Sequence, residues 1–372
     1  MKIISKYILK EMVGPFLVGF SLFTFIFLSD KMTELADLVI NYGVDFLTTL
    51  KLFIFIMPAF LAITMPMGVL VGVMVAFNRL NSDNEIIAMK LSGLNIRSLI
   101  TPVLISSLVV SILMVGWNNY VLTWGNTSFR NLVYTITRDH AAMVIQKKIF
   151  ISDFDKFVFY VDEKDDQTGF LNNIMVFTQE TETEPAYYIS AGTGYVFSDP
   201  KEKTVYLRLD NGYLHQVNSK NKTVYSKIKF SNYNIILDLK NKLSGMISNE
   251  KSAREMDLKE LGKEIKKTFA LGINTNVLKV EWHKKLAIPF ACMAFAIIGI
   301  ALGISIRIKG TSLGFLLSLG LILVYYFLLL AGEIAGSKGT IAPWLSMWLP
   351  NIVTTIVGIT IMYLAAKEKV SI

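Results

Sequence analysis

The 372-residue sequence predicts an α-helical membrane protein with six transmembrane helices and an inserted all-β domain. Hydrophobic residues make up 53% of the chain and charged residues 18%, whereas soluble domains average about 25% charged. Residues 125–280 hold 22 of the 37 Lys and Arg and 19 of the 29 Asp and Glu. The chain is therefore a polar central segment between two apolar ends.

Six apolar stretches approach or exceed the roughly 20 residues that a helix needs to cross a bilayer. The first follows Lys2, Lys6 and Lys10 but lacks a small-residue cleavage site, which favours a retained helix over a signal peptide. Pro58 and Pro66 predict that the second is kinked or broken. The six stretches cover residues 12–29, 52–77, 98–122, 286–306, 311–332 and 345–366.

The distribution of Lys and Arg predicts the orientation of these helices. With the N-terminus in the cytoplasm, ten basic residues fall in short cytoplasmic segments: Lys2, Lys6, Lys10, Arg79, Lys90, Arg97, Arg307, Lys309, Lys367 and Lys369. Three fall in short outer loops: Lys31, Lys51 and Lys338. The bias predicts that both termini are cytoplasmic and that the polar segment lies on the outer face.

The polar segment is predicted to be a β domain, because short runs of residues that alternate between apolar and polar, or that are rich in aromatic residues, recur between turn residues. This spacing indicates a sandwich, a roll or an open barrel. Asp210-Asn211-Gly212 predicts a hairpin between two of the strands. The predicted strands are Met143–Ile151, Phe157–Asp162, Ile174–Thr178, Tyr187–Phe197, Val205–Asp210, Tyr213–Val217 and Val224–Phe230.

Residues 250–269 show a helical period instead. Met256, Leu258, Leu261, Ile265 and Phe269 recur at helical spacing among Lys and Glu. This pattern predicts a short amphipathic helix before the fourth transmembrane helix. Such a helix either packs on the β domain, the more ordinary arrangement, or lies at the membrane surface.

A second short helix is predicted between transmembrane helices two and three. Ser82 or Asp83 is placed to cap its start, and Gly93 to end it. Ile86 and Met89 give it a small apolar face. Loop helices of this kind usually serve as connectors, but it is the one structured cytoplasmic element predicted, which makes it the candidate docking site for a partner.

The sequence lacks the motifs of common catalytic and metal sites. It contains no G-x-x-x-x-G-K-[ST] and no H-E-x-x-H, and its three histidines, His140, His215 and His283, are scattered. Cys292 is the only cysteine, so an internal disulfide is excluded. The net charge of +8 follows from topology and from a nearly balanced central segment, 22 − 19 = +3. We therefore expect no catalytic residues, no metal, no cofactor and no nucleic acid partner.

Ionisable residues at the membrane boundary have two readings. They are Asp30, Lys31, Glu281, His283, Lys284, Lys285 and Glu333. The simpler reading is that they mark the ends of the spans, where Lys extends toward water. The functional reading is an anionic-lipid site, in which basic side chains bind phosphates through charge-assisted hydrogen bonds.

Several motifs resemble those of the LptF/LptG permease family of the lipopolysaccharide exporter. The segment from Glu281 to Phe290 is similar to the family's E-x-H-K-[KR]-x-[AS]-x-P-x, and Gly299 to Gly303 to its G-x-P-L-G, with Ala301 at the usual proline. Further similar segments are Glu85–Gly93, Leu209–Gly212, Phe230–Leu239, Tyr325-Tyr326 and Pro343–Asn351. These motifs occur in the family's order, and the resemblance extends over nearly the whole chain.

The resemblance implies a fold with three divisions. Residues 1–122 would form transmembrane helices one to three with a coupling helix near 82–93. Residues 123–280 would form a periplasmic β-jelly-roll domain that ends in the short amphipathic helix. Residues 281–372 would form helices four to six, in the bacterial inner membrane.

The resemblance also implies a function. Members pair with a paralogous permease and a cytoplasmic ABC ATPase dimer, extract lipopolysaccharide from the outer leaflet and pass it to a periplasmic bridge protein. ATP would be bound by the partner, and this chain would be a non-catalytic subunit. Glu85, Met89, Ser92 and Gly93 would couple to the ATPase. Lys31, Lys284 and Lys285 would be the lipid-binding candidates.

Other classes of protein fit the sequence less well. A mechanotransmission membrane protein that works with an ATPase but moves no lipid itself is the main alternative, although six spans are more than the four typical of that class. A secondary transporter needs ion-coupling groups near the bilayer centre, and the central spans lack charges. A membrane enzyme needs paired carboxylates or histidines that are not evident.

Overall fold

The chain folds into two compact units, one mainly helical and one containing a β-sheet. A computed structural model describes residues 2–42, 45–139, 150–154, 157–164, 170–178, 187–199, 204–217, 225–237, 251–305 and 311–368. The helical unit comprises residues 1–34, 54–126 and 253–372, and the second unit comprises residues 35–53 and 127–252. The two units are described separately below.

Six helices in the described ranges are long and apolar enough to cross a membrane, as the sequence predicts. Each covers one of the predicted apolar stretches and extends beyond it, except that residue 306, the last of the fourth stretch, lies outside the described residues. The third continues from α4 through a π-helical turn, η1 (Trp117–Val121), into α5 (Leu122–Asp139). The others are α1 (Lys2–Tyr42), α2 (Phe46–Ser82), α4 (Arg97–Gly116) itself, α8 (Asn276–Ser305), α9 (Thr311–Lys338) and α10 (Pro343–Glu368).

The two prolines of α2 do not break the helix, so the broken form of the second span is wrong. α2 runs without interruption through Pro58 and Pro66. Donors from other helices reach its carbonyl groups near the prolines: Trp117 Nε1 donates to the carbonyl oxygen of Pro58 at 3.2 Å, and Tyr326 Oη to that of Ile63 at 2.9 Å. These bonds join α2 to its neighbours close to the prolines, whereas the carbonyl groups that lose a helical partner are those of Ile54 and Ala62, four residues before each proline.

The segment that follows η1 is helical rather than the beginning of the β domain. α5 continues to Asp139, so the first part of residues 123–280, the range expected to form the β domain, is helical. Its apolar residues Phe129, Leu132, Val133 and Ile136 pack together with Leu52 of α2 in the second unit. Their spacing of three or four residues is a helical period, which explains the difference.

The core of the helical unit lies around α2 and α8. Gly299 and Gly303 allow these helices to approach closely, since a Cβ at Gly303 would lie 2.6 Å from Phe77 Cβ and one at Gly299 would lie 3.1 Å from the Val73 side chain. Small residues four apart are the usual means of close packing between membrane helices. The family-like Gly299–Gly303 segment therefore has a structural reason.

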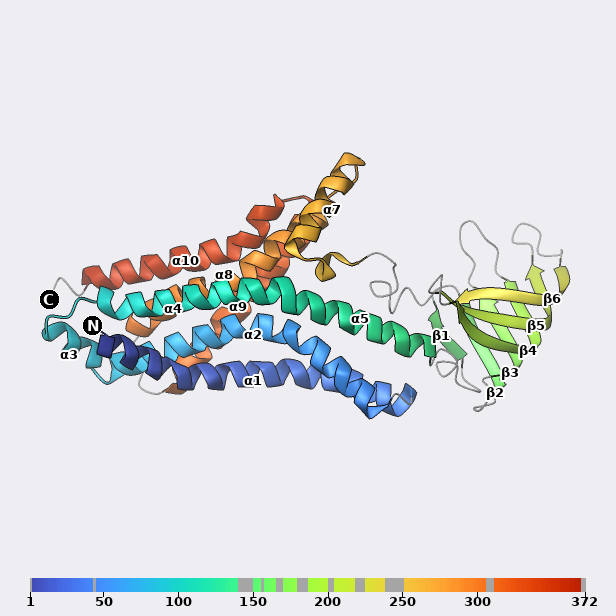
Figure 1. The fold of residues 1–372 in the computed structure, drawn as a ribbon, viewed down its shortest axis with the longest axis horizontal. Coiled ribbons are helices and arrows are strands. Elements are labelled where there is room, and N and C mark those ends of the chain that lie inside the picture. The colour runs from blue at the N-terminus through green and yellow to red at the C-terminus, as the bar shows by residue number, and fades with distance from the viewer. Residues whose placement is uncertain are drawn as a thin grey trace. The chain divides into compact units, whose positions relative to one another are not determined.

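Two short helices complete this unit, at opposite ends of the bundle (Figure 1). α3 (Glu85–Leu91) follows α2, at the end of the bundle where α1 begins and α10 ends. α7 (Leu258–Ala270), preceded by the 3-10 turn η2 (Ala253–Glu255), precedes α8 and diverges from the bundle. The predicted amphipathic helix is therefore present over part of residues 250–269. We call these two ends the α3 end and the α7 end.

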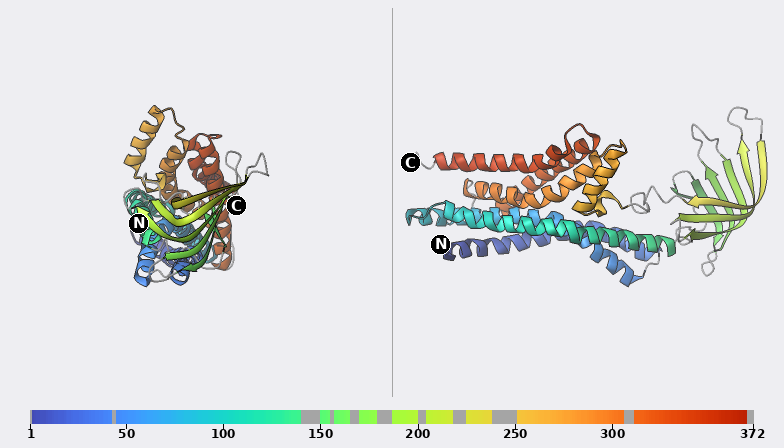
Figure 2. Two further views of the ribbon diagram at one scale, coloured as in Figure 1. Left: turned by 90° about the vertical axis from the view of Figure 1, so that its right-hand side faces the viewer. Right: turned by 45° about the horizontal axis from the view of Figure 1, so that its top comes forward.

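The second unit contains one curved antiparallel sheet (Figure 2). In the described residues the strand order is β1-β2-β3-β4-β5-β6, a meander in which every strand pairs with its neighbours in sequence. This confirms an inserted β domain, but the order differs from the Greek keys of a complete jelly roll. The strands are β1 (Phe150–Phe154), β2 (Phe157–Lys164), β3 (Phe170–Thr178), β4 (Tyr187–Asp199), β5 (Thr204–Val217) and β6 (Tyr225–Leu237). Most of the predicted strand Met143–Ile151 lies outside the described residues.

The hairpin predicted at Asp210-Asn211-Gly212 is wrong, because this tripeptide lies inside the single strand β5. Asp210 pairs with Thr193, and Gly212 pairs with Ala191, so the register is the same on both sides of Asn211. Asn211 has a φ of 54°, in the left-handed region that asparagine tolerates. The sequence resembles a hairpin turn because both structures need a residue with positive φ.

Asn211 belongs to a row of residues that crosses the sheet, which we call the crease. At this level the ladders of β2 to β6 each skip one pair, and Asn173 also has a positive φ, of 51°. On both sides of the crease the strands keep the same register. Along each strand every second side chain points to the buried face, and this alternation shifts by one residue at the crease. The crease consists of Asp162, Asn173, Gly192, Asn211 and Ser231.

One face of the sheet carries the core of the second unit, and this core continues across the crease. On β3 the buried side chains are Leu171 on one side and Ile174 and Val176 on the other. Half-buried aromatic and aliphatic side chains surround the core: Tyr187, Leu214, Phe230 and Tyr233. The rest of the core is Phe159, Val161, Ile189, Ala191, Leu207, Leu209 and Ile235. We call this the inner face of the sheet.

Candidate functional site

The coupling candidates lie on and after α3, which is fixed to the bundle by its apolar side. Ile86 is buried and Met89 half-buried in a cluster that includes side chains of α1, α2, α4 and α8. Asn84, rather than Ser82 or Asp83, precedes the first turn, with a φ of 58° and no side-chain cap. Asn84 therefore begins α3 through its backbone, with its carbonyl oxygen accepting from the N–H of Ala88 at 3.0 Å.

The end of α3 is built as the sequence predicts. Gly93 has a φ of 81°, and its N–H donates to the carbonyl oxygen of Lys90 at 3.0 Å. The N–H of Leu94 donates to the carbonyl oxygen of Met89 at 3.1 Å. These two bonds form a Schellman motif, which needs a left-handed residue and therefore favours glycine. The role of Gly93 in this structure is to end α3 and turn the chain toward α4.

The four predicted coupling residues differ in what they present to a partner. Glu85 is half-buried, and its Oε2 accepts a hydrogen bond from Tyr7 Oη at 2.7 Å. Met89 faces the bundle, whereas Ser92 and Gly93 are exposed. Leu91 is 84% exposed, which sequence reasoning missed. The sequence did contain a signal of this exposure: Leu91 lies two residues after Met89, and residues two apart on a helix do not share a face.

Beside α3, charged side chains tie α2 to its neighbours. Arg79 forms an ion pair with Glu11 of α1 and lies 3.5 Å from Asp83. Asn81 Nδ2 donates to the carbonyl oxygen of Ile304, at the end of α8, over 2.8 Å. The residues that precede α3 are thus bonded to α1 and α8, so a force applied to α3 would reach both helices.

At the α7 end, Lys284 lies in a group of four charged side chains. Lys284 Nζ is 2.7 Å from Glu333 Oε1 and 3.6 Å from Glu281 Oε1. Arg254 of η2 approaches the same two carboxylates, at 3.4 Å from Glu281 and 3.7 Å from Glu333. This group joins η2, α8 and α9.

Lys285 is buried and binds η1. Its Nζ donates to Thr123 Oγ1 at 2.9 Å and to the carbonyl oxygen of Asn118 at 3.4 Å. π-Helical turns are rare and occur preferentially at functional sites. The structure thus brings Lys284 and Lys285 into internal contacts. Lys31 lies on another helix, α1, with a partly exposed side chain, and its contact with lipid stays a prediction.

The remaining family-like motifs meet in the buried centre of the bundle. Tyr325 Oη donates to Asn351 Oδ1 at 2.8 Å, and Asn351 Nδ2 donates to the carbonyl oxygen of Ala287 at 2.8 Å. Segments that are far apart in the sequence therefore join α8, α9 and α10. Buried polar groups that are fully bonded favour one packing arrangement over others.

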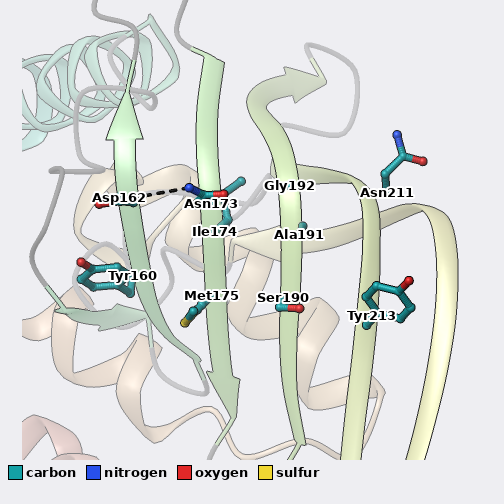
Figure 3. A pocket seen from close by; sticks show the side chains of 10 residues that line it. All are labelled: Tyr160, Asp162, Asn173, Ile174, Met175, Ser190, Ala191, Gly192, Asn211 and Tyr213. Atoms are coloured by element: carbon teal, nitrogen blue, oxygen red, sulfur yellow. Dashed lines mark hydrogen bonds between the residues drawn. The ribbon is translucent and has the colours of Figure 1, made fainter.

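The face of the sheet opposite the inner face has a shallow hollow over the crease, of about 470 Å³. In Figure 3, Tyr160 and Tyr213 stand on either side of it, with Asp162, Asn173 and Asn211 at the crease. Asn173 Nδ2 donates to Asp162 Oδ2 at 3.5 Å. These amide, carboxylate and hydroxyl groups suit water or a polar ligand, whereas the inner face suits apolar groups.

The charged groups of the sheet and of the bundle offer no evident metal site. In the described ranges, no three His, Cys, Asp or Glu side chains are placed to hold an ion. Near the crease, Arg208 Nε donates to Asp210 Oδ1 at 3.1 Å, which raises the pKa of the Arg208 guanidinium above its ordinary value. Arg208 is therefore a permanent cation.

Comparison with known proteins bears on these sites. A family model described as lipopolysaccharide export system permease LptF/LptG matches residues 6–364. An uncharacterized protein of Rickettsia prowazekii (strain Madrid E) is 21% identical over 196 residues, which are 52% of this chain and 53% of that protein. The chain thus matches this relative over about half of its length. The family match includes α3, the sheet and the charged group at the α7 end.

Proposed function

The chain belongs to the LptF/LptG family of lipopolysaccharide export permeases, and from this premise we propose that it extracts lipopolysaccharide from the outer leaflet of the bacterial inner membrane. In this proposal it works with a paralogous permease and a cytoplasmic ABC ATPase dimer, and it delivers lipid to a periplasmic bridge protein. Both termini lie in the cytoplasm and the β domain lies in the periplasm. The chain itself is a non-catalytic subunit that needs no cofactor.

The inner face of the sheet carries this proposal. A lipid chain that leaves the bilayer loses about 0.8 kcal/mol for each CH₂ that becomes exposed to water. For a chain of about a dozen carbons this is roughly 10 kcal/mol, and the lipid has several chains. Extraction therefore needs an apolar surface outside the membrane. The inner face supplies apolar side chains of this kind, and the half-buried Tyr187 and Leu214 lie at its border.

The proposed energy input enters at α3. Its apolar side faces the bundle, and its exposed side presents Leu91, Ser92 and Gly93 to a partner in the cytoplasm. Because Asn81 and Arg79 tie the preceding residues to α8 and α1, movement of a docked ATPase would shift these helices together. We assign Leu91 to the docking surface, beside the residues expected from the family resemblance.

Adjacent tyrosines on opposite faces of β4 allow a direct test. Tyr187 packs on the inner face, and Tyr188 lies on the other face, stacked on His215 with ring centroids 4.2 Å apart. Each is replaced in turn by photoreactive benzoylphenylalanine, in the full chain reconstituted with its ATPase and second permease in lipopolysaccharide-containing vesicles. After irradiation with and without ATP, adducts are detected with an antibody against lipopolysaccharide.

We expect an ATP-dependent adduct at position 187 and none at position 188. Equal labelling at the two positions would mean that lipid contacts the sheet without using the inner face. Absence of any adduct in a complex that still hydrolyses ATP would contradict lipid transport, and would favour mechanotransmission without lipid movement.

A further inference from the structure

The two halves of α7 have different surroundings. The first half is bound to the bundle: Asp257 caps the helix in a reciprocal pair with Glu260, and the N–H of Leu258 donates to Asn119 Oδ1 of η1 at 2.8 Å. Leu261, in the same half, is fully buried. The second half has no buried residue, so it projects from this anchor.

The second half of α7 and the turn into α8 expose four large apolar side chains within nine residues. Phe269 is 71% exposed, Leu271 67%, Ile273 58% and Val277 55%. The turn itself is well defined, because Gly272 has a φ of 72° and the N–H groups of Gly272 and Ile273 donate to the carbonyl oxygens of Phe269 and Thr268. We call residues 263–279 the α7–α8 elbow.

Lysines surround this apolar surface. Residues 258–279 contain five lysines and two glutamates, a net charge of 5 − 2 = +3. Lys279 Nζ lies 5.8 Å from the centroid of the Phe269 ring. An apolar surface bordered by basic side chains is typical of helices that lie in the interface of an anionic membrane.

The position of the elbow along the bundle fits that interface. Asn276 begins α8, a spanning helix, and Trp282 follows six residues later, which is about 9 Å along the helix axis. Lys285, one turn beyond Trp282, contacts Thr123, so the turns of α8, η1 and α5 lie at one level. All five tryptophans of the chain lie in helical turns near the α7 end of the bundle: Trp117, Trp124, Trp282, Trp344 and Trp348. Tryptophan concentrates at membrane–water interfaces.

We propose that the α7–α8 elbow is a lipid-binding element that inserts into the membrane interface beside α8. Phe269, Leu271, Ile273 and Val277 contact the upper acyl chains, and Lys263, Lys266 and Lys267 bind the phosphates of anionic phospholipids. Since α7 begins on η1, the elbow links the surrounding membrane to the helix turn that Lys285 holds. This inference depends on the chain spanning a membrane and not on which lipid it exports.

Site-directed fluorescence on the full chain tests the proposal, because Cys292 is fully buried and thiol dyes can be directed to a new cysteine. Phe269→Cys and Ile273→Cys place the dye NBD on the apolar surface. Lys259→Cys is the matched control on the polar side of the anchored half. The protein is reconstituted in nanodiscs of equal parts phosphatidylglycerol and phosphatidylethanolamine, and quenching by acyl-brominated lipid is compared with quenching by aqueous iodide.

Insertion predicts that brominated lipid lowers the emission at 269 and 273 at least about twofold more than at 259, and that iodide acts in the reverse order. Iodide quenching at all three positions would overturn the proposal, because the elbow would lie in water. Protection from both quenchers at 269 and 273 would also overturn it, because protein would cover the surface.

Charge reversal tests the lysine contacts separately. Lys263→Glu, Lys266→Glu and Lys267→Glu together should lower lipid quenching at position 269 in the anionic discs, and should have a smaller effect in discs of phosphatidylcholine alone. An equal effect in the two kinds of disc would contradict binding of anionic headgroups. All three lysines are exposed or half-exposed, so the variant should fold.

Discussion

At the scale of single residues, conformation and burial decide what a position can do. Gly93 and Lys285 both lie in segments that resemble family motifs, and the structure gives each a definite physical task. Gly93 has a φ of 81° and ends α3. Lys285 is buried against η1. Each task can be tested by a single substitution.

Gly93→Ala should loosen α3 without disturbing its neighbours. No atom lies within 4 Å of the position of an added Cβ, so the effect is confined to the left-handed backbone, at about 1–2 kcal/mol. Amide hydrogen exchange over residues 85–92 should accelerate about tenfold. Gly14→Ala, also without neighbours within 4 Å but inside α1, is the control and should not accelerate exchange in α3. Unchanged exchange at 85–92 in Gly93→Ala would contradict this role.

Lys285→Met should lower stability rather than only lipid binding. It removes the buried donor to Thr123 and Asn118 and leaves these two acceptors without their partner, which should cost about 1–3 kcal/mol. The Tm in detergent should fall clearly, and the fall for Lys284→Met should be smaller because Arg254 also approaches Glu281 and Glu333. A lipid-binding role alone would instead weaken lipid labelling and leave the Tm unchanged.

At the scale of elements, the crease and α3 show that neighbouring helices and strands decide which structure a short sequence motif forms. Asn211 satisfies the requirements of a tight hairpin and of a strand residue with positive φ equally well. The distinction lies in Asn173 and Gly192 on adjacent strands, which are at the same level of the sheet. Residues 205–217 taken alone do not contain that information.

Asn211→Val should destabilise the sheet, whereas Asn211→Gly should be tolerated. A β-branched residue with a φ near 54° costs at least about 1–2 kcal/mol, and glycine adopts this conformation freely. Limited proteolysis of the β domain in the full chain measures the difference. Thr193→Val, next to the crease and exposed, is the matched control and should leave the cleavage rate unchanged. Equal cleavage of Asn211→Val and Thr193→Val would contradict the constraint.

Leu91→Arg should release the ATPase without unfolding the permease. Leu91 is 84% exposed, so the charge meets no internal contact, but it would fall in the proposed docking surface. Ile3→Arg is the matched control, 85% exposed at the same end of the bundle. Co-purification of the ATPase should be lost for Leu91→Arg only, with both variants retaining the Tm of the wild type. Loss in both variants would mean that charge at this end, and not α3 docking, is responsible.

At the scale of the whole molecule, the sequence predicted the six spans and the inserted β domain because long apolar runs and period-two strands are strong signals. It missed α5, whose helical period at Phe129, Leu132 and Ile136 lies in a segment too polar to suggest a span. At the α3 segment, Glu85 and Gly93 were found from their types, but the exposure of Leu91 depends on which side of α3 packs on the bundle. Lys285 could not be separated from Lys284, because only the fold decides which of two adjacent lysines is buried.

The crease also has a mechanical consequence. A sheet resists bending through its rungs of interstrand hydrogen bonds, and along this one row the ladders of five neighbouring strands lack a rung together. The row is therefore the line along which the sheet bends most easily. Flexing about it would change the width between the two halves of the inner face while every register on either side stayed intact.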